Sequence, residues 1–408
     1  MKQTVRILFL LTTFYALGVF TGKASAAGLR YAETDSIRIS LLTCEAGNEI
    51  YALFGHTALR VENLTRGTDV VYNYGIFDFD SPNFAFRFAL GETDYLLGRA
   101  SFMNFAAGNF YKGLDINQLT FDLRQDEKLR LIRLLEENYL PENRRYRYNY
   151  FYDNCATRPR DKLEEAVEGE IVYADDMLDP HTGLTFRDMI HVYSDGHPWS
   201  RFGMDLCLGS KADEEVCLRL LCFVPFRMED ALRRAGISDS LGVVRPLVIK
   251  EELVLNSDES LNPNLEARFI TPLQTTLLLL LIVVVCSVIE VRRKKTWWGI
   301  DAGLLVLTGL MGCVLAFMSI WSQHPAIAPN YLLIAFHPLH ILLLPEVICR
   351  LRKGKVSLYL TAVGVVLIFF LLLHPLIPQN FNPAVLPLAL CLLIRSVSNV
   401  CIFRKLRR

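Results

Sequence analysis

The chain has 408 residues, of which 52% are hydrophobic, and its 43 basic and 43 acidic side chains give a formal net charge of zero. A balanced charge argues against the basic surface that nucleic-acid binding normally needs, so no nucleic-acid partner is expected. The hydrophobic residues concentrate at the N-terminus and after residue 271, whereas the long stretch between them is mixed. This distribution predicts an aqueous domain followed by a membrane domain.

The N-terminus has the pattern of a secretory signal peptide. Two basic residues precede an apolar run, and the small residues ASAAG follow it. We assign residues 1–27 to the signal, with cleavage near Ala26 or Ala27. An uncleaved anchor helix is the alternative, and the segment that follows is exported in both cases.

A mixed exported domain is predicted over 28–268, and the two short runs in it that carry chemistry start at Cys44 and Tyr146. The first, CEAGNEIYALFGHTALRVEN, ends in an alternating pattern that predicts a strand from His56, and Gly55 permits a close approach of another backbone or of a ligand. A second β-rich run, VVYNYGIFDF, follows a polar loop. The two runs predict a hairpin in which His56 and Asn73 are neighbours.

Two further segments between these runs are informative about structure. Residues 82–113 are rich in aromatic side chains, which favours core packing but also fits an acyl-chain groove or a surface that faces the bilayer. Residues 125–139 have the apolar periodicity of an amphipathic helix.

The second run, YRYNYFYDNCATRPRDKLEEAVEG, places one cysteine ahead of a predicted helix. Asp153 and Asn154 are good N-caps, and a thiol in the first helical turn faces free N–H groups that lower its pKa. Pro159 opposes a helix that begins at Cys155, so the alternative is a helix from Pro159 with the cysteine in a tight turn before it.

The basic residues after this cysteine, Arg158 and Arg160, are expected to stabilise a thiolate or an anionic headgroup. A lone histidine on a strand is more often structural, and a lone exported cysteine is more often disulfide-bonded or buried. Together, however, His56 and Cys155 fit a nucleophile–base pair.

The ten cysteines divide equally between the apolar C-terminal part and the exported domain. The exported ones are Cys44, Cys155, Cys207, Cys217 and Cys222. This odd number leaves at least one unpaired thiol if no partner protein contributes a cysteine, and the sequence leaves the pairing open. The Cys and His spacings do not indicate a zinc site, so no metal is expected.

Five apolar segments of about 20 residues follow residue 268, and each is long enough to cross an apolar layer ~30 Å thick as a helix. They are residues 273–290, 299–321, 330–349, 356–374 and 384–403. We therefore predict a transmembrane domain with five spans over 269–408.

The connections between these segments alternate in charge. VRRKK, RLRKGK and the terminal RKLRR are strongly basic, whereas SQHPAIAPN and HPLIPQNFNP contain neither Lys nor Arg. Basic connections stay in the cytoplasm, which places the domain 28–268 on the opposite side of the membrane.

Ionisable residues within or beside the spans usually mark a function or a buried pair. His337 and His340 fall within the third span, and His324 and His374 are expected at the outer surface, where they are possible substrate contacts. Arg395 lies in the fifth span, from which it is expected to extend toward the cytoplasm.

The stretches AGNEIYALFGHTALRV, VVYNYGIFDF and YNYFYDNCATRPRD, followed by five spans, resemble the Lnb-type lipoprotein N-acyltransferases. The resemblance runs from about Ile39 to the C-terminus. It implies an α+β fold: an exported domain like the permuted papain-like proteins of the lecithin:retinol acyltransferase group, and a C-terminal bundle of five transmembrane helices.

The resemblance also implies a function. His56 takes the thiol proton of Cys155, which attacks an ester of a membrane phospholipid and carries the acyl chain as a thioester to the N-terminal amine of a diacylglyceryl-cysteine lipoprotein. Phospholipid, bacterial lipoproteins and the lipid bilayer are the expected partners, and no cofactor is expected. The expected location is the bacterial inner membrane, as a multi-pass protein with its catalytic domain in the periplasm.

A third polar residue usually orients the imidazole in such proteins, and Asn73 is the candidate, with Glu49, Asp153 and Asn154 as alternatives. The candidate substrate-binding residues are Arg158, Arg160, Tyr72 and Asn154.

Two other functions use the same residues. A membrane-anchored cysteine peptidase or amidase acting on cell-envelope peptides would need the same pair, although a soluble substrate requires neither the aromatic-rich domain nor five spans. A non-catalytic envelope assembly protein would hold Cys155 in a disulfide.

Overall fold

The computed structural model describes residues 31–77, 83–92 and 94–407, so the predicted signal peptide lies outside the described residues. The chain divides into the units Met1–Thr34 and Asp35–Arg408, and the second unit contains every element discussed below. This unit combines a sheet-rich N-terminal part with a helical C-terminal part, and the predicted α+β class is confirmed.

An antiparallel seven-stranded sheet organises the N-terminal part, in the order β10-β5-β1-β2-β3-β4-β6. Its strands are β1 Ile37–Cys44, β2 His56–Asn63, β3 Thr68–Phe77, β4 Asp94–Ser101, β5 Ile116–Phe121, β6 Arg145–Arg147 and β10 Val248–Leu255. A small second sheet contains β7 Glu170–Val172, β8 Gly236–Ser238 and β9 Val244–Pro246.

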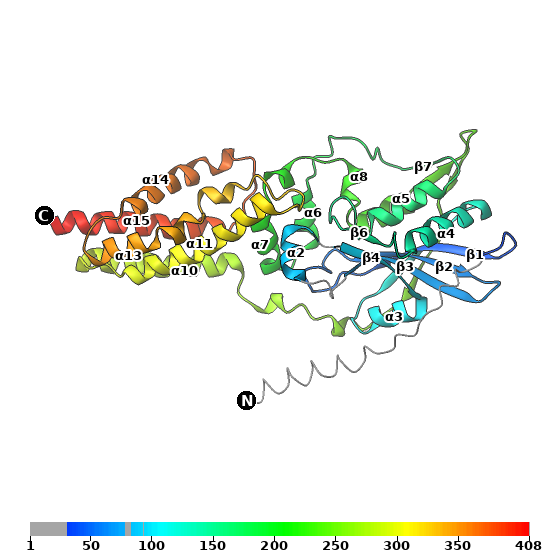
Figure 1. Cartoon of the computed structure of the whole chain (residues 1–408), viewed down its shortest axis with the longest axis horizontal. Helices are drawn as coiled ribbons and strands as arrows, with labels where there is room; N and C mark the ends of the chain where they lie inside the picture. The colour runs from blue at the N-terminus through cyan, green and yellow to red at the C-terminus, as the bar shows by residue number, and fades with distance from the viewer. Residues whose placement is uncertain (1–30, 78–82, 93, 408) are drawn as a thin grey trace, which may run out of the picture. The chain divides into compact units, whose positions relative to one another are not determined.

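Helices cover both faces of the large sheet (Figure 1). The helices of this part are α2 Phe84–Leu90, α3 Phe102–Phe110, α4 Gln125–Tyr139, α5 Thr157–Ala166, α6 Phe186–Tyr193, α7 Pro198–Cys207, α8 Leu218–Leu221 and α9 Pro225–Arg233, with short 3-10 turns η1 Ser210–Asp213, η2 Glu259–Leu261 and η3 Glu266–Arg268. Helices α4 and α5 pack on one face, and α3 packs against β3 and β4 on the other. Because side chains alternate along a strand, β2 directs His56 and Ala58 toward the face of α3 and Thr57 toward that of α5.

The local predictions for this part are confirmed. Strand β2 begins at His56 and pairs with β3 as an antiparallel hairpin, and α4 has the predicted bounds Gln125–Tyr139. Gly55 has a positive φ of 76°, and a Cβ there would lie 2.9 Å from the carbonyl oxygen of Cys44. The glycine therefore permits the close backbone approach that precedes β2.

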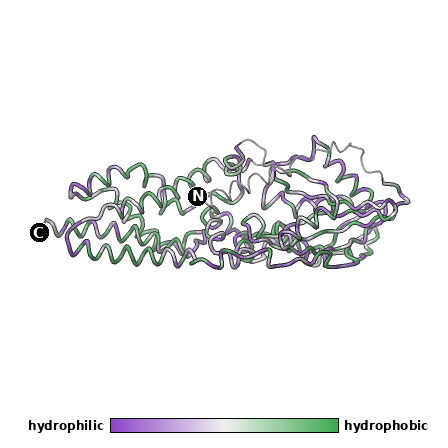
Figure 2. The backbone as a smooth tube through the Cα atoms, turned by 90° about the horizontal axis from the view of Figure 1, so that it is seen from below, coloured by the Kyte–Doolittle hydropathy of each residue, from purple (hydrophilic) through white to green (hydrophobic). Residues whose placement is uncertain are grey.

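Long apolar helices form the C-terminal part, and Figure 2 shows their hydrophobic character along most of their length. The elements are α10 Pro272–Arg293, α11 Trp298–Trp321, η4 Tyr331–Ile334, α12 Leu339–Leu342, α13 Leu344–Arg352, α14 Leu358–Leu373, η5 His374–Leu376 and α15 Val385–Arg407. In the described part of the chain, four helices are long and apolar enough to cross a membrane, and a fifth span is obtained if the bent pair 331–342 and 344–352 counts as one.

The predicted third span is therefore not one straight helix. Its two halves meet at an angle of 68°. His340, in the first half, is fully buried: its Nδ1 lies 2.6 Å from the hydroxyl of Tyr359 and its Nε2 lies 3.1 Å from the carbonyl oxygen of Ala335. Protein groups thus satisfy the polar atoms of this histidine at the break.

The prediction that Arg395 extends toward the cytoplasm is wrong. Its side chain is 1% exposed, and it forms ion pairs with Glu290 of α10 and Asp301 of α11, the latter at 2.7 Å. Asn399 donates a further hydrogen bond to Asp301. An unpaired guanidinium is costly in an apolar layer, so two carboxylates from neighbouring helices hold this one inside the bundle.

Hydrogen bonds join the N-terminal part to the connections between the apolar helices. Arg187 is buried between Asp205 and Asp213, at 2.8 Å from each. The amides of Asn382 and Asn380, from the connection after η5, donate to the same two aspartates at 2.9 and 2.8 Å. The carboxylates that neutralise Arg187 thus also bind the N-terminal part of the chain to the transmembrane part.

Replacement of Arg395 by leucine should leave Glu290 and Asp301 buried without a counter-charge. We expect the loss of about 3–5 kcal/mol of stability, which a lower midpoint of thermal unfolding in detergent would report. The matched control is the triple variant R395L/E290Q/D301N, which removes all three charges and should recover much of the loss. An R395L protein with the midpoint of the unmodified protein would contradict the role assigned to this ion pair.

Candidate active site

His56, the first residue of β2, is held by a side chain of the neighbouring strand. Its Nε2 lies 2.5 Å from Oδ1 of Asn73 on β3. Since an amide oxygen only accepts hydrogen bonds, Nε2 carries the proton in this contact, and Nδ1 keeps a lone pair in the neutral ring. The predicted proximity of the two side chains is therefore present, in the tautomer that a general base needs.

Cys155 lies in a tight turn immediately before α5, which begins at Thr157. The side-chain oxygen of Asn154 accepts hydrogen bonds from the backbone N–H groups of Ala156 and Thr157, at 2.8 and 3.0 Å. Pro159 is the third residue of the helix, where a backbone N–H would have no intrahelical partner. The helix thus begins at neither of the two expected positions, Cys155 and Pro159. It begins between them, with the cysteine in the turn before it and the proline in its first turn.

The two chemical groups meet across the end of the sheet. The Cys155 thiol and the His56 imidazole act on each other, since each group shifts the pKa of the other, and the backbone N–H groups of Thr57 and Cys155 also lower the pKa of the thiol. In addition, the Thr57 hydroxyl donates to the carbonyl oxygen of Cys155 at 2.6 Å. Strand β2 therefore supplies the base and also fixes the turn that carries the thiol.

The surroundings favour the ion pair of thiolate and imidazolium. Burial raises the pKa of Cys155, but the charge and hydrogen bond of His56, together with the two backbone amides, outweigh it and bring the pKa below its ordinary value. Burial likewise lowers the pKa of His56, but the Cys155 thiolate and the hydrogen bond to Asn73 outweigh it and leave the pKa raised. The arrangement can thus form a reactive thiolate near neutral pH.

Gly75 lies beside the pair. It has a positive φ of 88° beside the irregular pairing of β3 with β4, and a Cβ there would lie 3.5 Å from Cβ of Cys155 and 3.9 Å from Cε1 of His56. The left-handed backbone is what requires glycine here, since a Cβ would make only ordinary contacts with Cys155 and His56.

Tyr148 is a site residue that sequence reasoning missed. Its half-buried side chain lies beside Cys155 at Gly75, and its ring stacks on Tyr95 with the centroids 4.0 Å apart. Burial raises the pKa of this hydroxyl, and the nearby Cys155 raises it further, so the group stays protonated and able to donate. Its only signal in the sequence was the tyrosine-rich run before the cysteine, which does not distinguish one tyrosine from another.

The two arginines near the cysteine are engaged inside the protein. Arg158 forms a bidentate pair with Asp153, at 2.5 and 2.7 Å, and its guanidinium stacks over the ring of Tyr146 at 3.5 Å. Arg160 is buried, pairs with Asp161 at 2.7 Å and donates to the carbonyl oxygen of Arg219 at 3.0 Å.

The other candidate side chains also contact protein groups. Tyr72 is fully buried beneath α4, where its hydroxyl donates to Glu136. The amide nitrogen of Asn154 donates to the carbonyl oxygens of Tyr150 and Phe223, at 2.9 and 2.8 Å. Glu49 is exposed on the loop before β2. Of the candidates for the third position, Asn73 is the one whose side chain contacts the imidazole.

A small cavity of about 240 Å³ adjoins Asn73. Its lining is mostly apolar and comes from β3, β4, α3 and the end of α4: Asn73, Ile76, Leu96, Leu97, Gly98, Arg99, Ala100, Phe105, Tyr139 and Arg144. The cavity begins next to Asn73, the residue that contacts the imidazole, and it offers space for an apolar group.

The site also borders the connections at the membrane surface. The hydroxyl of Tyr150, five residues before the cysteine, donates to the carbonyl oxygen of Pro325 at 2.9 Å. Helix α2 lies close to the end of α11: Phe86 is 5.8 Å from Phe317 between ring centroids, and Nε2 of His324 lies 2.6 Å from the carbonyl oxygen of Phe88. The aromatic-rich segment thus has two positions in the structure: Phe86 lies against α11, and Phe105 lines the cavity.

All ten cysteines lie in the described part of the chain and have free thiols. Within the same residues, no three His, Cys, Asp or Glu side chains form a group that could hold a metal ion.

The lowered pKa of Cys155 predicts alkylation at lower pH than for an ordinary thiol. Burial raises the pKa of Cys207, so this partly exposed cysteine is an internal control in the same protein. Iodoacetamide labelling followed by peptide mass spectrometry should give a pH midpoint below 9 for Cys155 and a higher one for Cys207, and H56A should raise the Cys155 midpoint. The midpoint reports the pKa rather than access, so equal midpoints for the two thiols would contradict the ion pair.

Comparison with known proteins agrees with the organisation described above. No curated protein and no solved structure matches this chain. Two family models do: the Lnb N-terminal periplasmic domain over residues 24–191 and the Lnb transmembrane domain over residues 264–406. Both belong to one family and match in the expected order, so the chain is a multi-pass membrane protein of the Lnb family.

Proposed function

We propose that this protein transfers an acyl chain from a membrane phospholipid to the N-terminal amine of a lipoprotein. The observation that carries the proposal is the pairing of Cys155 with His56 in a domain hydrogen-bonded to the membrane-surface connections. The family suggests a role in lipoproteins of the cell envelope. The chemistry of the site supports the finer assignment.

In the first half-reaction, Nδ1 of His56 takes the thiol proton of Cys155. The sulfur attacks an ester carbonyl of the phospholipid, and the tetrahedral intermediate collapses with cleavage of the carbon–oxygen ester bond. The imidazolium returns its proton to the departing alkoxide, which leaves as lysophospholipid. The acyl chain stays on the sulfur as a thioester.

In the second half-reaction, the free α-amine of a diacylglyceryl-cysteine attacks the thioester. His56 accepts the amine proton, the carbon–sulfur bond breaks, and the thiolate returns as an amide forms. Lysophospholipid leaves before the lipoprotein amine reacts, so the scheme requires ping-pong kinetics. An amine is a stronger nucleophile than the hydroxyl of lysophospholipid, and an amide is more stable than an ester, which favours aminolysis over reversal.

The negative oxygen of each tetrahedral intermediate needs donors close to the sulfur. The backbone N–H of Cys155 and the hydroxyl of Tyr148 both act on the sulfur electrostatically in the free protein. Donors already directed at the reaction centre stabilise developing charge without reorganisation. We assign Tyr148 this role.

Both substrates are held in the membrane, and two features support their access to the thiol. Phe86 and Phe88 of α2 are 58% and 45% exposed, next to the end of a membrane-spanning helix. The hydrogen bond between Tyr150 and Pro325 keeps the catalytic turn near the same connection. These contacts favour a substrate whose ester group lies at the bilayer surface, whereas a soluble peptide would not require them.

For four of the residues suggested by the sequence, we propose positioning roles instead of substrate binding. Asn154 caps α5, and Arg158 ties the turn to Asp153. Arg160 and Tyr72 are buried and hydrogen-bonded at a distance from the thiol.

Loss of either partner of the pair should abolish transfer. We expect C155S and H56A to lower the formation of triacylated lipoprotein at least about a thousandfold, with the protein still in the membrane fraction. Mass spectrometry of lipoprotein N-termini, in a strain without other N-acyltransferases, measures the product. Triacylated lipoprotein formed by either variant would contradict the assignment, and cleavage of envelope peptides with no acyl transfer would favour the peptidase alternative.

The hydroxyl of Tyr148 has a matched control two residues away. Among the described residues, the hydroxyl of Tyr146 is buried without a hydrogen-bond partner. We expect Y148F to lower kcat about a hundredfold with little change in KM, because it removes one donor from the oxyanion. Y146F should leave both constants nearly unchanged, and equal effects of the two substitutions would refute the role of Tyr148.

A further inference from the structure

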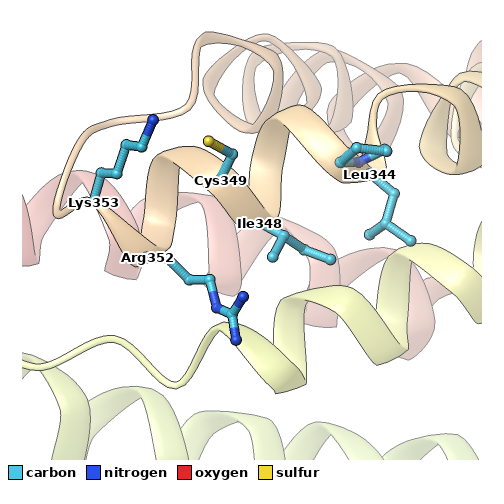
Figure 3. A pocket seen from close by; sticks show the side chains of 6 residues that line it. Leu344, Ile348, Cys349, Arg352 and Lys353 are labelled. Atoms are coloured by element: carbon cyan, nitrogen blue, oxygen red, sulfur yellow. The ribbon is translucent and has the colours of Figure 1, made fainter.

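A groove of about 510 Å³ lies along the outer face of α13, far in sequence from the catalytic pair. It is lined by Leu344, Pro345, Ile348, Cys349, Arg352 and Lys353. Figure 3 shows Cys349 and Lys353 along one side of the helix and Ile348 and Arg352 along the other.

The lining residues form two rows at helical spacing. One row contains Leu344, Ile348 and Arg352, and the other contains Pro345, Cys349 and Lys353, each with a step of four residues. Residues four apart lie on the same side of a helix, so the apolar members of both rows occupy one end of the groove and both cations occupy the other. The rows run for about 12 Å along the axis.

The two cations are available to an outside partner. Arg350, on the same helix, is paired with Glu346 at 3.1 Å. Arg352 instead stacks over the ring of Trp298 at 4.6 Å, a contact that leaves its guanidinium edge free to donate. Within the described residues, no carboxylate lies within ion-pair distance of Arg352 or Lys353, and both side chains are exposed.

The position of α13 fixes the kind of surroundings that the groove meets. Its cationic end opens the basic connection 350–355, which the alternation of charge places on the cytoplasmic side. Its apolar end continues into α12 and the broken third span, whose outward side chains, such as Leu342 and Leu343, are exposed on the helical bundle. The groove thus runs from the headgroup level of the cytoplasmic leaflet into its hydrocarbon.

We propose that this groove binds one anionic glycerophospholipid of the cytoplasmic leaflet. The phosphodiester lies between Arg352 and Lys353, and an acyl chain lies between the two rows of side chains. Two cations without counter-ions favour a headgroup with net negative charge, such as phosphatidylglycerol. The amine of phosphatidylethanolamine would instead be placed beside like charges.

The site is separate from the proposed catalysis, because it lies at the opposite end of the membrane-spanning helices from the connection 322–330, which contacts Tyr150 and Phe88. A lipid there bridges α13 to the start of α11 through Arg352 and Trp298. We therefore expect it to stabilise the broken span rather than to serve as the acyl donor.

The test is native mass spectrometry of the full chain in mild detergent, with equal amounts of phosphatidylglycerol and phosphatidylethanolamine of identical acyl chains. The unmodified protein should retain phosphatidylglycerol in preference. The variant R352Q/K353Q should retain it about tenfold less, with retention of phosphatidylethanolamine unchanged. The matched control is R292Q/R293Q, which removes two exposed cations from the end of α10, outside the groove.

A second variant tests the groove independently of the charges. Cys349 is an exposed lining residue, so C349W fills the groove without disturbing the core or either cation. We expect it to reduce retention of phosphatidylglycerol. The proposal is overturned if the unmodified protein shows no preference, if R352Q/K353Q or C349W retains the lipid as well as the unmodified protein does, or if R292Q/R293Q loses as much as R352Q/K353Q.

Discussion

The turn 149–155 is held at both ends, and the geometry of the catalytic pair depends on it. Reciprocal backbone hydrogen bonds between Asn149 and Asp153, at 3.0 and 2.8 Å, close the turn on itself. Thr57 of β2 holds its end at the carbonyl of Cys155, while Tyr150 holds its beginning at Pro325. Each of these bonds contributes only about 0.5–1.5 kcal/mol. Together they fix the sulfur relative to the imidazole before a substrate arrives, which is what preorganised catalysis requires.

Two buried guanidinium groups extend the same constraint to the rest of the molecule. Arg187 pairs with Asp205 and Asp213. The same two carboxylates accept hydrogen bonds from the connection after η5, so they join the N-terminal part to the transmembrane part. Arg395 joins three membrane-spanning helices through Glu290 and Asp301. A buried ion pair adds little net stability, but a buried charge without its partner is costly. Such networks therefore favour the one packing arrangement in which every charge is paired.

The sequence predicted what depends on local pattern. The start of β2 at His56, the bounds of α4 and the proximity of Asn73 follow from strand alternation, helical periodicity and the short loop of a hairpin. Tyr148 could not be selected, because its role depends on where β6 and the following turn lie relative to the sulfur. Arg395 was misplaced for a related reason: its carboxylate partners are about a hundred residues away and meet it only when the helices pack. The break in the third span was not predicted, because hydropathy depends on composition and contains no information about the direction of the helix axis.

Two cysteines lie near the same imidazole, and their surroundings differ in a way that favours a thiolate at Cys155 and a thiol at Cys44. Cys44 is directly opposite His56 in the pairing of β1 with β2, yet burial, with a further contribution from the charge of Cys155, raises the pKa of its thiol. It packs among the apolar side chains Leu42, Ala58 and Ile116. Cys155 is as deeply buried, but backbone N–H groups and the imidazole surround its sulfur and stabilise the charged form. Proximity to a base is therefore insufficient, because a thiolate forms only where the surroundings replace the hydrogen bonds that water would have provided.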